Sequence, residues 1–185
     1  MNIVLVNPRF RAWSPTVLIP LGLAYIAAVL EKEGYGVKTI DMNSEKVSDG
    51  RLQREVSGTD CVGITGMITE YQEVLRLTEI IKEVDEQIKI ILGGRLATTL
   101  PRELLQSSRA DFVVIGEGEK TVLSLLSAIK QGGNPASVKG IAYKDGNQLF
   151  ITGCPEPIAN LDTIPFPARH LFNIAHYTRN LFHNF

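Results

Sequence analysis

The sequence predicts an α/β fold in which a parallel five-stranded sheet is covered by helices on both faces. Five short apolar runs rich in Val and Ile alternate with helical segments along the chain. Each run is continuously apolar, which is typical of strands buried on both faces. Right-handed crossovers between such strands give a doubly wound sheet. A flavodoxin-like (Rossmann-like) strand order, 2-1-3-4-5, is the first expectation, and a six-stranded dinucleotide-binding order is the alternative.

The composition narrows the classes of possible partner. The chain has 185 residues, 44% of them hydrophobic, which suits one domain with a short appendage. Its formal net charge of −1 provides no field that would attract nucleic acid or acidic lipid. The most apolar long stretch, residues 16–30, contains Pro20 and Gly22 and is too short to span a bilayer. We therefore expect neither nucleic acid nor a membrane as a partner.

The cysteines and the amino terminus indicate the compartment. Cys61 and Cys154 lie far apart, in no metal-binding spacing and no disulfide framework. Cys61 opens an apolar strand and is predicted to be a small core residue. The chain passes from Met1 directly into a strand, without a signal-type segment. These features predict a cytoplasmic protein.

The first two strands flank a long loop and a helix. Residues 2–6 form the first strand, which the Asn7-Pro8 turn ends. The loop of residues 9–19 carries Trp13, which we expect either to cover a ligand face or to pack against the core, and loops of this length tend to be functional. A helix begins near Pro20 and ends at Gly34, and residues 37–40 form the second strand.

The third and fourth strands each end in small residues. After a partly helical segment, residues 43–58, a strand opens at Cys61 and ends in Thr65-Gly66-Met67. Residues 70–86 have the apolar spacing of an amphipathic helix. Residues 88–92 form the fourth strand, which runs into Gly93-Gly94, and a short helix starts at Pro101.

The fifth strand precedes the most informative turn. Residues 112–115 form a buried strand, Gly116 and Gly118 bracket Glu117, and a helix follows until Gly132. This succession places bare backbone at the carboxyl end of the sheet, where open α/β sheets bind ligands. Glycine without a Cβ lets a flat ligand approach the main chain. The same turn could also be a tight strand-to-helix connection, with acids that favour the helix amino end.

Three segments divide the chain. Residues 1–135 form the predicted Rossmann-like domain. Residues 136–153 form a β-hairpin extension, because Asp145-Gly146 separates two strand-like runs. Residues 154–185 hold four prolines within 155–167 and form an extended linker and tail that leaves the domain.

The ends of the predicted strands share a neutral, glycine-rich chemistry. No GxxxxGK[ST] phosphate loop is present, no GxGxxG follows the first strand, and the paired acids of a phosphoacceptor site are absent. Glu117 and Glu119 would repel a phosphate at the helix that follows them. Such an edge favours a large, flat, amide-decorated ligand held by main-chain groups.

Six motifs in order along nearly the whole chain resemble the amino-terminal cobalamin (B12)-binding domain of B12-dependent radical S-adenosylmethionine (SAM) enzymes. The GEGE turn followed by the proline-rich linker is the most specific pair among them. The motifs are Val6-Asn7-Pro8, Pro20-Leu-Gly-Leu-Ala-Tyr25, Val62-Gly-Ile-Thr-Gly-Met67, Leu92-Gly-Gly94, Gly116-Glu-Gly-Glu119 and Leu161-Asp-Thr-Ile-Pro-Phe-Pro-Ala-Arg169.

The resemblance implies a flavodoxin-like domain that holds the corrin ring across the carboxyl edge of the sheet, with the nucleotide tail of cobalamin in a cleft. It implies no catalytic residue and no metal ligand in this chain. In the full protein it implies a radical SAM domain in cis, absent here, with a [4Fe-4S] cluster, SAM and methyltransferase-like chemistry. The cofactor-binding residues it implies are Asn7, Pro8, Thr65, Gly66, Met67, Gly93, Gly94, Gly116, Glu117 and Gly118.

The sequence lacks a motif of other cobalamin domains, as is common in the radical SAM group that it resembles, and it differs from that group at two positions. The DxHxxG string that supplies a histidine ligand to cobalt in other cobalamin domains is absent, because the only histidines are His170, His176 and His183. This absence predicts base-off cobalamin without a protein histidine. Leu96 stands where the family's GGxHxT motif has histidine, and Arg9 stands where many relatives have proline.

Two further hypotheses remain open. The chain could be a degenerate domain that keeps the fold, has lost the cofactor, and serves substrate gating or partner contact; Leu96 and the absent core histidine motivate this alternative. It could also be a stand-alone Rossmann-like nucleotide binder, which the acids at Glu117 and Glu119 disfavour.

Overall fold

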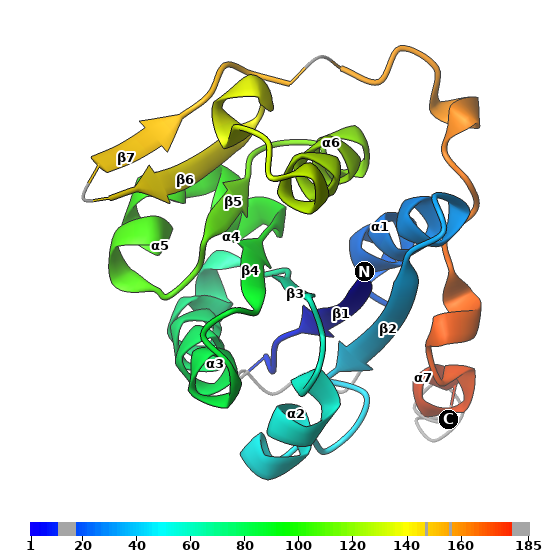
Figure 1. Ribbon diagram of the computed structural model, residues 1–185. Helices are drawn as coiled ribbons and strands as arrows, with labels where there is room; N and C mark the ends of the chain where they lie inside the picture. Colours follow the sequence, from blue (N-terminus) through cyan, green and yellow to red (C-terminus); the bar gives the residue numbers. More distant parts are fainter. Residues whose placement is uncertain (11–17, 147, 156, 179–185) are drawn as a thin grey trace.

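The computed structural model describes residues 1–10, 18–146, 148–155 and 157–178, so Trp13 and His183 lie outside the described residues. Seven strands form one sheet with helices on both sides (Figure 1). The strands are β1 (Asn2–Asn7), β2 (Gly36–Asp41), β3 (Cys61–Ile64), β4 (Lys89–Leu92), β5 (Phe112–Val114), β6 (Ile141–Asp145) and β7 (Gln148–Ile151).

The sheet confirms the predicted order and corrects the predicted number of strands. Its order is β2-β1-β3-β4-β5-β6-β7, and the first five strands are parallel in the expected 2-1-3-4-5 arrangement. The expectation of a five-stranded sheet was wrong, because the predicted hairpin pairs antiparallel with β5 and continues the sheet. Val113 pairs with Ala142 at this junction, and both are fully buried. The pairing satisfies the backbone groups along β5, which would otherwise be an open edge.

Two layers of helices cover the sheet. Helices α1 (Leu21–Lys32) and α6 (Gly118–Gln131) lie on one face, where Leu23 and Leu125 belong to the same buried cluster as Leu5 of β1. The other face carries a second cluster, which includes Leu52, Leu77 and Leu104 (Figure 1). Its helices are α2 (Asp49–Val56), α3 (Tyr71–Val84), α4 (Gly94–Thr99) and α5 (Pro101–Ser107).

Strand β3 shows how continuous apolar runs serve both layers. Val62 and Ile64 face the α2/α3 layer, whereas Cys61 faces the α1/α6 layer. Cys61 is fully buried, as predicted for a small core residue, and burial raises the pKa of its thiol above the ordinary value. Helix α4 was not predicted, because the glycines that open it favoured a loop.

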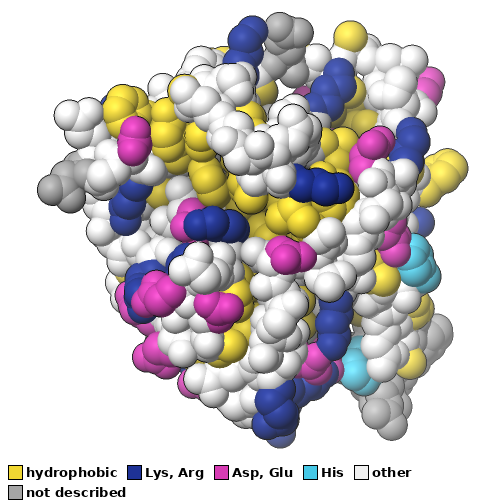
Figure 2. Space-filling model, in the orientation of Figure 1, with side chains coloured by type: hydrophobic (Ala, Val, Ile, Leu, Met, Phe, Trp, Pro, Cys, Tyr) yellow, Lys and Arg dark blue, Asp and Glu magenta, His cyan; other side chains and the backbone are white. Residues whose placement is uncertain are grey.

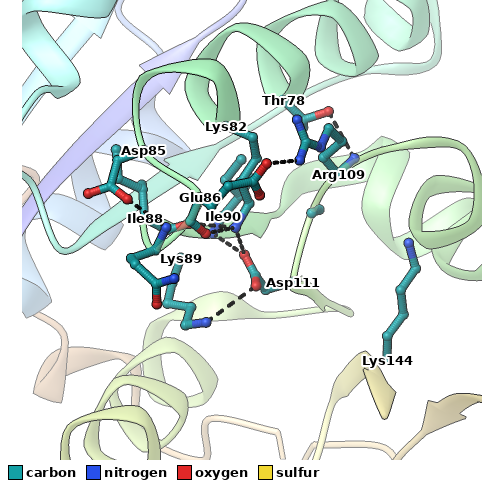
Figure 3. A network of polar contacts seen from close by, with 12 residues as sticks. Thr78, Lys82, Asp85, Glu86, Ile88, Lys89, Ile90, Arg109, Asp111 and Lys144 are labelled. Carbon is teal, nitrogen blue, oxygen red and sulfur yellow. Dashed lines mark hydrogen bonds and ion pairs between the residues drawn. The ribbon is translucent and has the colours of Figure 1, made fainter. Parts of the chain in front are cut away.

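The amino edge of the sheet is closed by a charged network between α3, β4 and β5 (Figure 3). The Lys82 ammonium donates to the backbone carbonyls of Glu86 and Ile88, at 3.0 and 2.8 Å, and to Asp111 Oδ2 at 2.9 Å. Asp111 Oδ2 also accepts the backbone N–H of Ile90 at 2.8 Å. Lys82 is only 6% exposed, so its charge is buried but fully partnered.

The segment after the hairpin returns to the domain instead of leaving it. The backbone N–H of Ala168 donates to the carbonyl of Ala24 in α1 at 3.0 Å, and the Thr39 hydroxyl donates to the carbonyl of Leu171. The short helix α7 (Ile174–Thr178) follows, and Figure 1 shows this segment running beside α1 and β2. Phe172 and Tyr177 pack on Ala24. The predicted extended linker therefore packs, in its described part, along one side of the sheet. We call residues 168–178 the strap.

No helix among the described residues is long and apolar enough to cross a membrane.

Candidate cofactor-binding site

The predicted site residues lie together along the carboxyl edge of the sheet. Ladder hydrogen bonds continue one residue beyond the strands: Thr65 N donates to the carbonyl of Val6 at 3.1 Å, and Gly93 N to the carbonyl of Ile64 at 2.8 Å. Since β1, β3 and β4 end level with one another, the loops that follow them start side by side. The residues brought to this edge are Asn7, Pro8, Thr65, Gly66, Met67, Gly93, Gly94, Gly116, Glu117 and Gly118.

Two of the glycines are required by backbone conformation. Gly94 has φ +82° and Gly116 has φ +78°, a region that other residues rarely adopt. A Cβ on Gly94 would also lie 2.6 Å from Thr65 Oγ1 and 3.0 Å from the carbonyl oxygen of Gly66. Gly94 therefore serves the close packing of the β3 and β4 loops, and the space its missing Cβ leaves is filled by the protein.

Gly93, unlike Gly94, has open space where a Cβ would lie. Its φ of −140° is ordinary extended backbone, and a Cβ at this position would meet no atom within 4 Å. Met67 beside it is 56% exposed, and Ile68 is 58% exposed. Leu18 and Leu21, which enter α1 from the same edge, are 73% and 48% exposed. The edge thus offers bare backbone at Gly93 among exposed apolar side chains, which suits a broad apolar ring better than an anion.

Thr98 joins two of the glycine loops and was not predicted. Its hydroxyl accepts the backbone N–H of Gly116 at 3.0 Å and donates to the carbonyl of Gly94 at 3.1 Å. One side chain thus holds both positive-φ glycines. The family pattern GGxHxT contains this threonine, so the motif carried a signal that a local analysis of glycines did not use.

Leu96, the departure from that motif, is a core residue. It is 2% exposed, packs against Gly66 and belongs to the cluster on the α2/α3 face. Its backbone N–H donates to the carbonyl of Gly66 at 2.9 Å. The Leu96 side chain is therefore part of the core and does not line the cavity.

A cavity of about 220 Å³ extends from the carboxyl edge down between the sheet, α1 and α6. Thr65, Gly93 and Gly116 line it at the edge, and Ile3 and Leu30 line it deeper in the fold. Figure 2 shows hydrophobic side chains at the surface in the area where Figure 1 draws α6 and α1. The walls of the cavity are mainly apolar, and the Thr65 hydroxyl and the acids Glu117 and Glu119 lie near its opening.

Small residues at alternate positions of one strand line this cavity. Cys61, Gly63 and Thr65 point to the α1/α6 face because side chains alternate along a strand. A Cβ on Gly63 would lie 2.8 Å from Leu5 Cδ2, so the neighbouring side chain leans into the space that Gly63 leaves. This period-two pattern was visible in the sequence.

The segment that follows the hairpin contacts the GEG turn. Glu117 accepts the backbone N–H of Ile158 at 3.3 Å, and Pro155 lies 3.7 Å from the position of a Cβ on Gly116. The Glu117 carboxylate therefore already accepts one hydrogen bond from the protein. Gly118 packs close to Ile26 of α1.

Neither of the described histidines lines the cavity at this edge. His170 pairs with Glu31 at 3.0 Å near the end of α1, and His176 lies in α7 beside Asn173. Within residues 1–10, 18–146, 148–155 and 157–178, no group of three or more His, Cys, Asp and Glu side chains could hold a metal ion.

The fold and this edge define a class of protein: a flavodoxin-like domain with an apolar, glycine-lined carboxyl edge and a cavity beneath it. The family model for the B12 binding domain matches residues 11–126. The chain therefore belongs to the B12-binding domain family.

Curated relatives agree with this family. Over 95% of its length, the chain is 30% identical to cytidylyl-2-hydroxyethylphosphonate methyltransferase of Streptomyces wedmorensis. Over 89% of its length, it is 30% identical to the anaerobic magnesium-protoporphyrin IX monomethyl ester cyclase of Rubrivivax gelatinosus. The chain spans only 41% and 32% of the lengths of these two relatives.

Solved structures share the fold. The cobalamin-dependent SAM radical enzyme OxsB with aqua-cobalamin bound superposes with a TM-score of 0.85 over 97% of this chain and 25% of its own, at 18% identity. The radical SAM methyltransferase TsrM of Kitasatospora setae, with cobalamin and a [4Fe-4S] cluster bound, gives a TM-score of 0.73 over 82% of this chain and 30% of its own, at 22% identity. This chain, a member of the B12-binding domain family, therefore shares its fold with domains of these two larger proteins.

Proposed function

We propose that the chain holds cobalamin with the corrin across the carboxyl edge and the nucleotide tail in the cavity between α1 and α6. The observation that carries this proposal is the continuity of the cavity with the bare backbone of Gly93. A flat ring needs main chain that it can approach closely, and its appended tail needs a deep apolar slot. Both are present at the same place. The ten predicted cofactor-binding residues remain part of this proposal.

The chain's own residues would bind and orient the cofactor. The Thr65 hydroxyl lies at the opening of the cavity and can exchange a hydrogen bond with a polar group of the tail. The exposed side chains of Met67 and Leu21 can cover apolar parts of the corrin and exclude water. When bound, cobalamin would supply a transferable methyl group or related cobalt chemistry.

We propose the base-off state without a protein histidine ligand. The histidines of the chain are confined to residues 170–183, and neither His170 nor His176 lines the cavity. The tail base, if it occupies the apolar cavity, is separated from the cobalt as well.

The activity of the whole protein is also a proposal. By similarity to the methyltransferases above, a radical SAM domain in cis, with a [4Fe-4S] cluster and SAM, would perform the chemistry, and residues 154–185 would connect it to domain 1–135 and hairpin 136–153. This chain alone would be non-catalytic. The free thiols Cys61 and Cys154 support a cytoplasmic location.

The competing hypothesis of a degenerate domain rests on Leu96 and on the absent core histidine. Leu96 is 2% exposed and does not line the cavity. The cavity and the uncovered backbone of Gly93 are features that a domain without a cofactor would not need to keep.

Titration of the chain with hydroxocobalamin, followed by visible spectroscopy and calorimetry, tests the proposal. We expect saturable one-to-one binding and a base-off spectrum. An absence of binding by this chain, together with an absence of binding by a longer protein that includes the following domain, would contradict it. Binding only by the longer protein would show that the two domains share the site.

A further inference from the structure

Asp41, at the carboxyl end of β2, is a buried carboxylate with three donors. It is 3% exposed. Its Oδ1 accepts the side-chain amide of Asn7 at 2.8 Å and the backbone N–H of Asn43 at 3.0 Å, and its Oδ2 accepts the hydroxyl of Tyr177 at 2.6 Å. A buried carboxylate is stable only when its lone pairs are satisfied in this way.

This carboxylate fixes the orientation of the Asn7 amide. A carboxylate can only accept hydrogen bonds, so the amide nitrogen of Asn7 must face Asp41 and its carbonyl oxygen must point elsewhere. None of the described residues donates a hydrogen bond to that oxygen. Within the described part of the chain, Asn7 therefore has an unpaired acceptor at the end of β1, on the proposed cofactor edge.

Tyr177 reaches Asp41 from the strap, far away in the sequence. Its ring is 6% exposed and packs with Phe172 on Ala24 of α1. Burial, and then the hydrogen bond to Asp41, raise the pKa of the Tyr177 hydroxyl above its ordinary value. The hydroxyl thus stays protonated at neutral pH and remains a donor.

We propose that Tyr177 is a positioning residue of the cofactor edge: its hydroxyl holds Asp41, and Asp41 holds the Asn7 amide with its carbonyl oxygen toward the ligand. This inference rests on the proposed function, because the expected donor is an N–H of an amide on the corrin periphery. It assigns residues 168–178 a role in cofactor binding as well as in connection.

The first test needs no cofactor. In Tyr177→Phe, Asp41 loses one of its two side-chain donors, and we expect the side-chain amide signals of Asn7 to shift and to exchange faster with water in nuclear magnetic resonance spectra. Tyr143→Phe is the matched control, because Tyr143 is also a buried tyrosine but stacks on Phe150 in the hairpin. The control is expected to leave the Asn7 signals unchanged.

The second test is a double-mutant cycle read by hydroxocobalamin affinity. Loss of an oriented hydrogen bond predicts that Tyr177→Phe weakens binding about fivefold, and Asn7→Ala by a similar factor. If Tyr177 acts through Asn7, the double variant is no weaker than Asn7→Ala alone. Tyr143→Phe should bind as the wild type does, and thermal melting of each variant checks that it is folded.

The outcomes separate the two proposals. Additive losses in the cycle, or unchanged Asn7 signals in Tyr177→Phe, would overturn the positioning role while cobalamin binding stands. If the wild type binds no hydroxocobalamin, either alone or with its following domain, the proposed function is wrong. The role of Tyr177 in cofactor binding is then wrong as well. The Asn7 signals would then still show whether Tyr177 orients the amide.

Discussion

The two edges of the sheet satisfy their polar groups in different ways. At the amino edge, Lys82 and Asp111 are buried or half-buried and bind each other and the neighbouring backbone (Figure 3). At the carboxyl edge, Gly93 has open space above its backbone, and the carbonyl oxygen of Asn7 has no donor among the described residues. The polar groups of the amino edge are satisfied within the protein, and under the proposed function the ligand would satisfy those left open at the carboxyl edge. Stability and function are thus assigned to opposite ends of the same strands.

The largest effect is expected at the amino edge. Lys82→Ala leaves Asp111 half-buried and without its closest charged partner, and it leaves two backbone carbonyls without their donor. We expect the free energy of unfolding to fall by about 3 kcal/mol, measured by urea denaturation. The control is Lys89→Ala, since Lys89 is 40% exposed and 3.6 Å from the same carboxylate, and such a pair contributes less than about 1 kcal/mol. Equal losses in the two variants would contradict the importance of burial.

Gly93→Leu tests the carboxyl edge, where we expect a loss of ligand binding without a loss of stability. The backbone at Gly93 accepts any residue and nothing lies within 4 Å of the added Cβ, so stability should change by less than about 1 kcal/mol. Hydroxocobalamin affinity should fall at least about tenfold, because the side chain would occupy the ligand's place. Gly153→Leu is the control, as a Cβ there also meets no atom within 4 Å. Unchanged affinity in Gly93→Leu would remove Gly93 from the site.

Thr98→Val probes the bridge between the two glycine loops. Loss of its bonds to Gly116 and Gly94 should cost about 1 kcal/mol of stability and weaken hydroxocobalamin binding by about threefold to fivefold. Thr98→Ser keeps the hydroxyl and should restore both values. A serine variant that behaves like the valine variant would show that the methyl group, and not the hydroxyl, is what matters.

The smallest effect is expected for the exposed pair at the amino end of the strap. Glu31→Gln removes the partner of His170, whose side chain is 66% exposed. Solvent screens such pairs, so the melting temperature should change by no more than about 1 °C. A larger change would mean that this contact, and not the packing of Phe172 and Tyr177, holds the strap in place.

Much of the fold followed from local patterns. The strand order was predicted because continuous apolar runs and short helices leave few parallel topologies. The hairpin was predicted from Asp145-Gly146, but its pairing with β5 was not, since pairing between elements distant along the chain leaves no local signal. Helix α4 was missed because its first residue, Gly94, needs a positive φ and resembles a loop residue.

The site was predictable to a similar extent. The glycine turns could be assigned to one edge by topology alone. Asp41 and Tyr177 could not be linked by pattern, because 136 positions separate them and only folding brings them together. Thr98 and the alternation of Cys61, Gly63 and Thr65 were readable signals, one in the family motif and one in the period of the strand.

The strap has a consequence for the order of folding. Its contacts with Thr39 and Ala24 close loops of more than a hundred residues, as the separation of 132 between Thr39 and Leu171 shows. Contacts of such high order form slowly, after the local units of the sheet. During synthesis, residues 1–146 can therefore assemble the cavity while the strap is still undocked. We expect Tyr177 to reach Asp41 late in folding, so that the Asn7 amide is fixed only after the sheet and the cavity have formed.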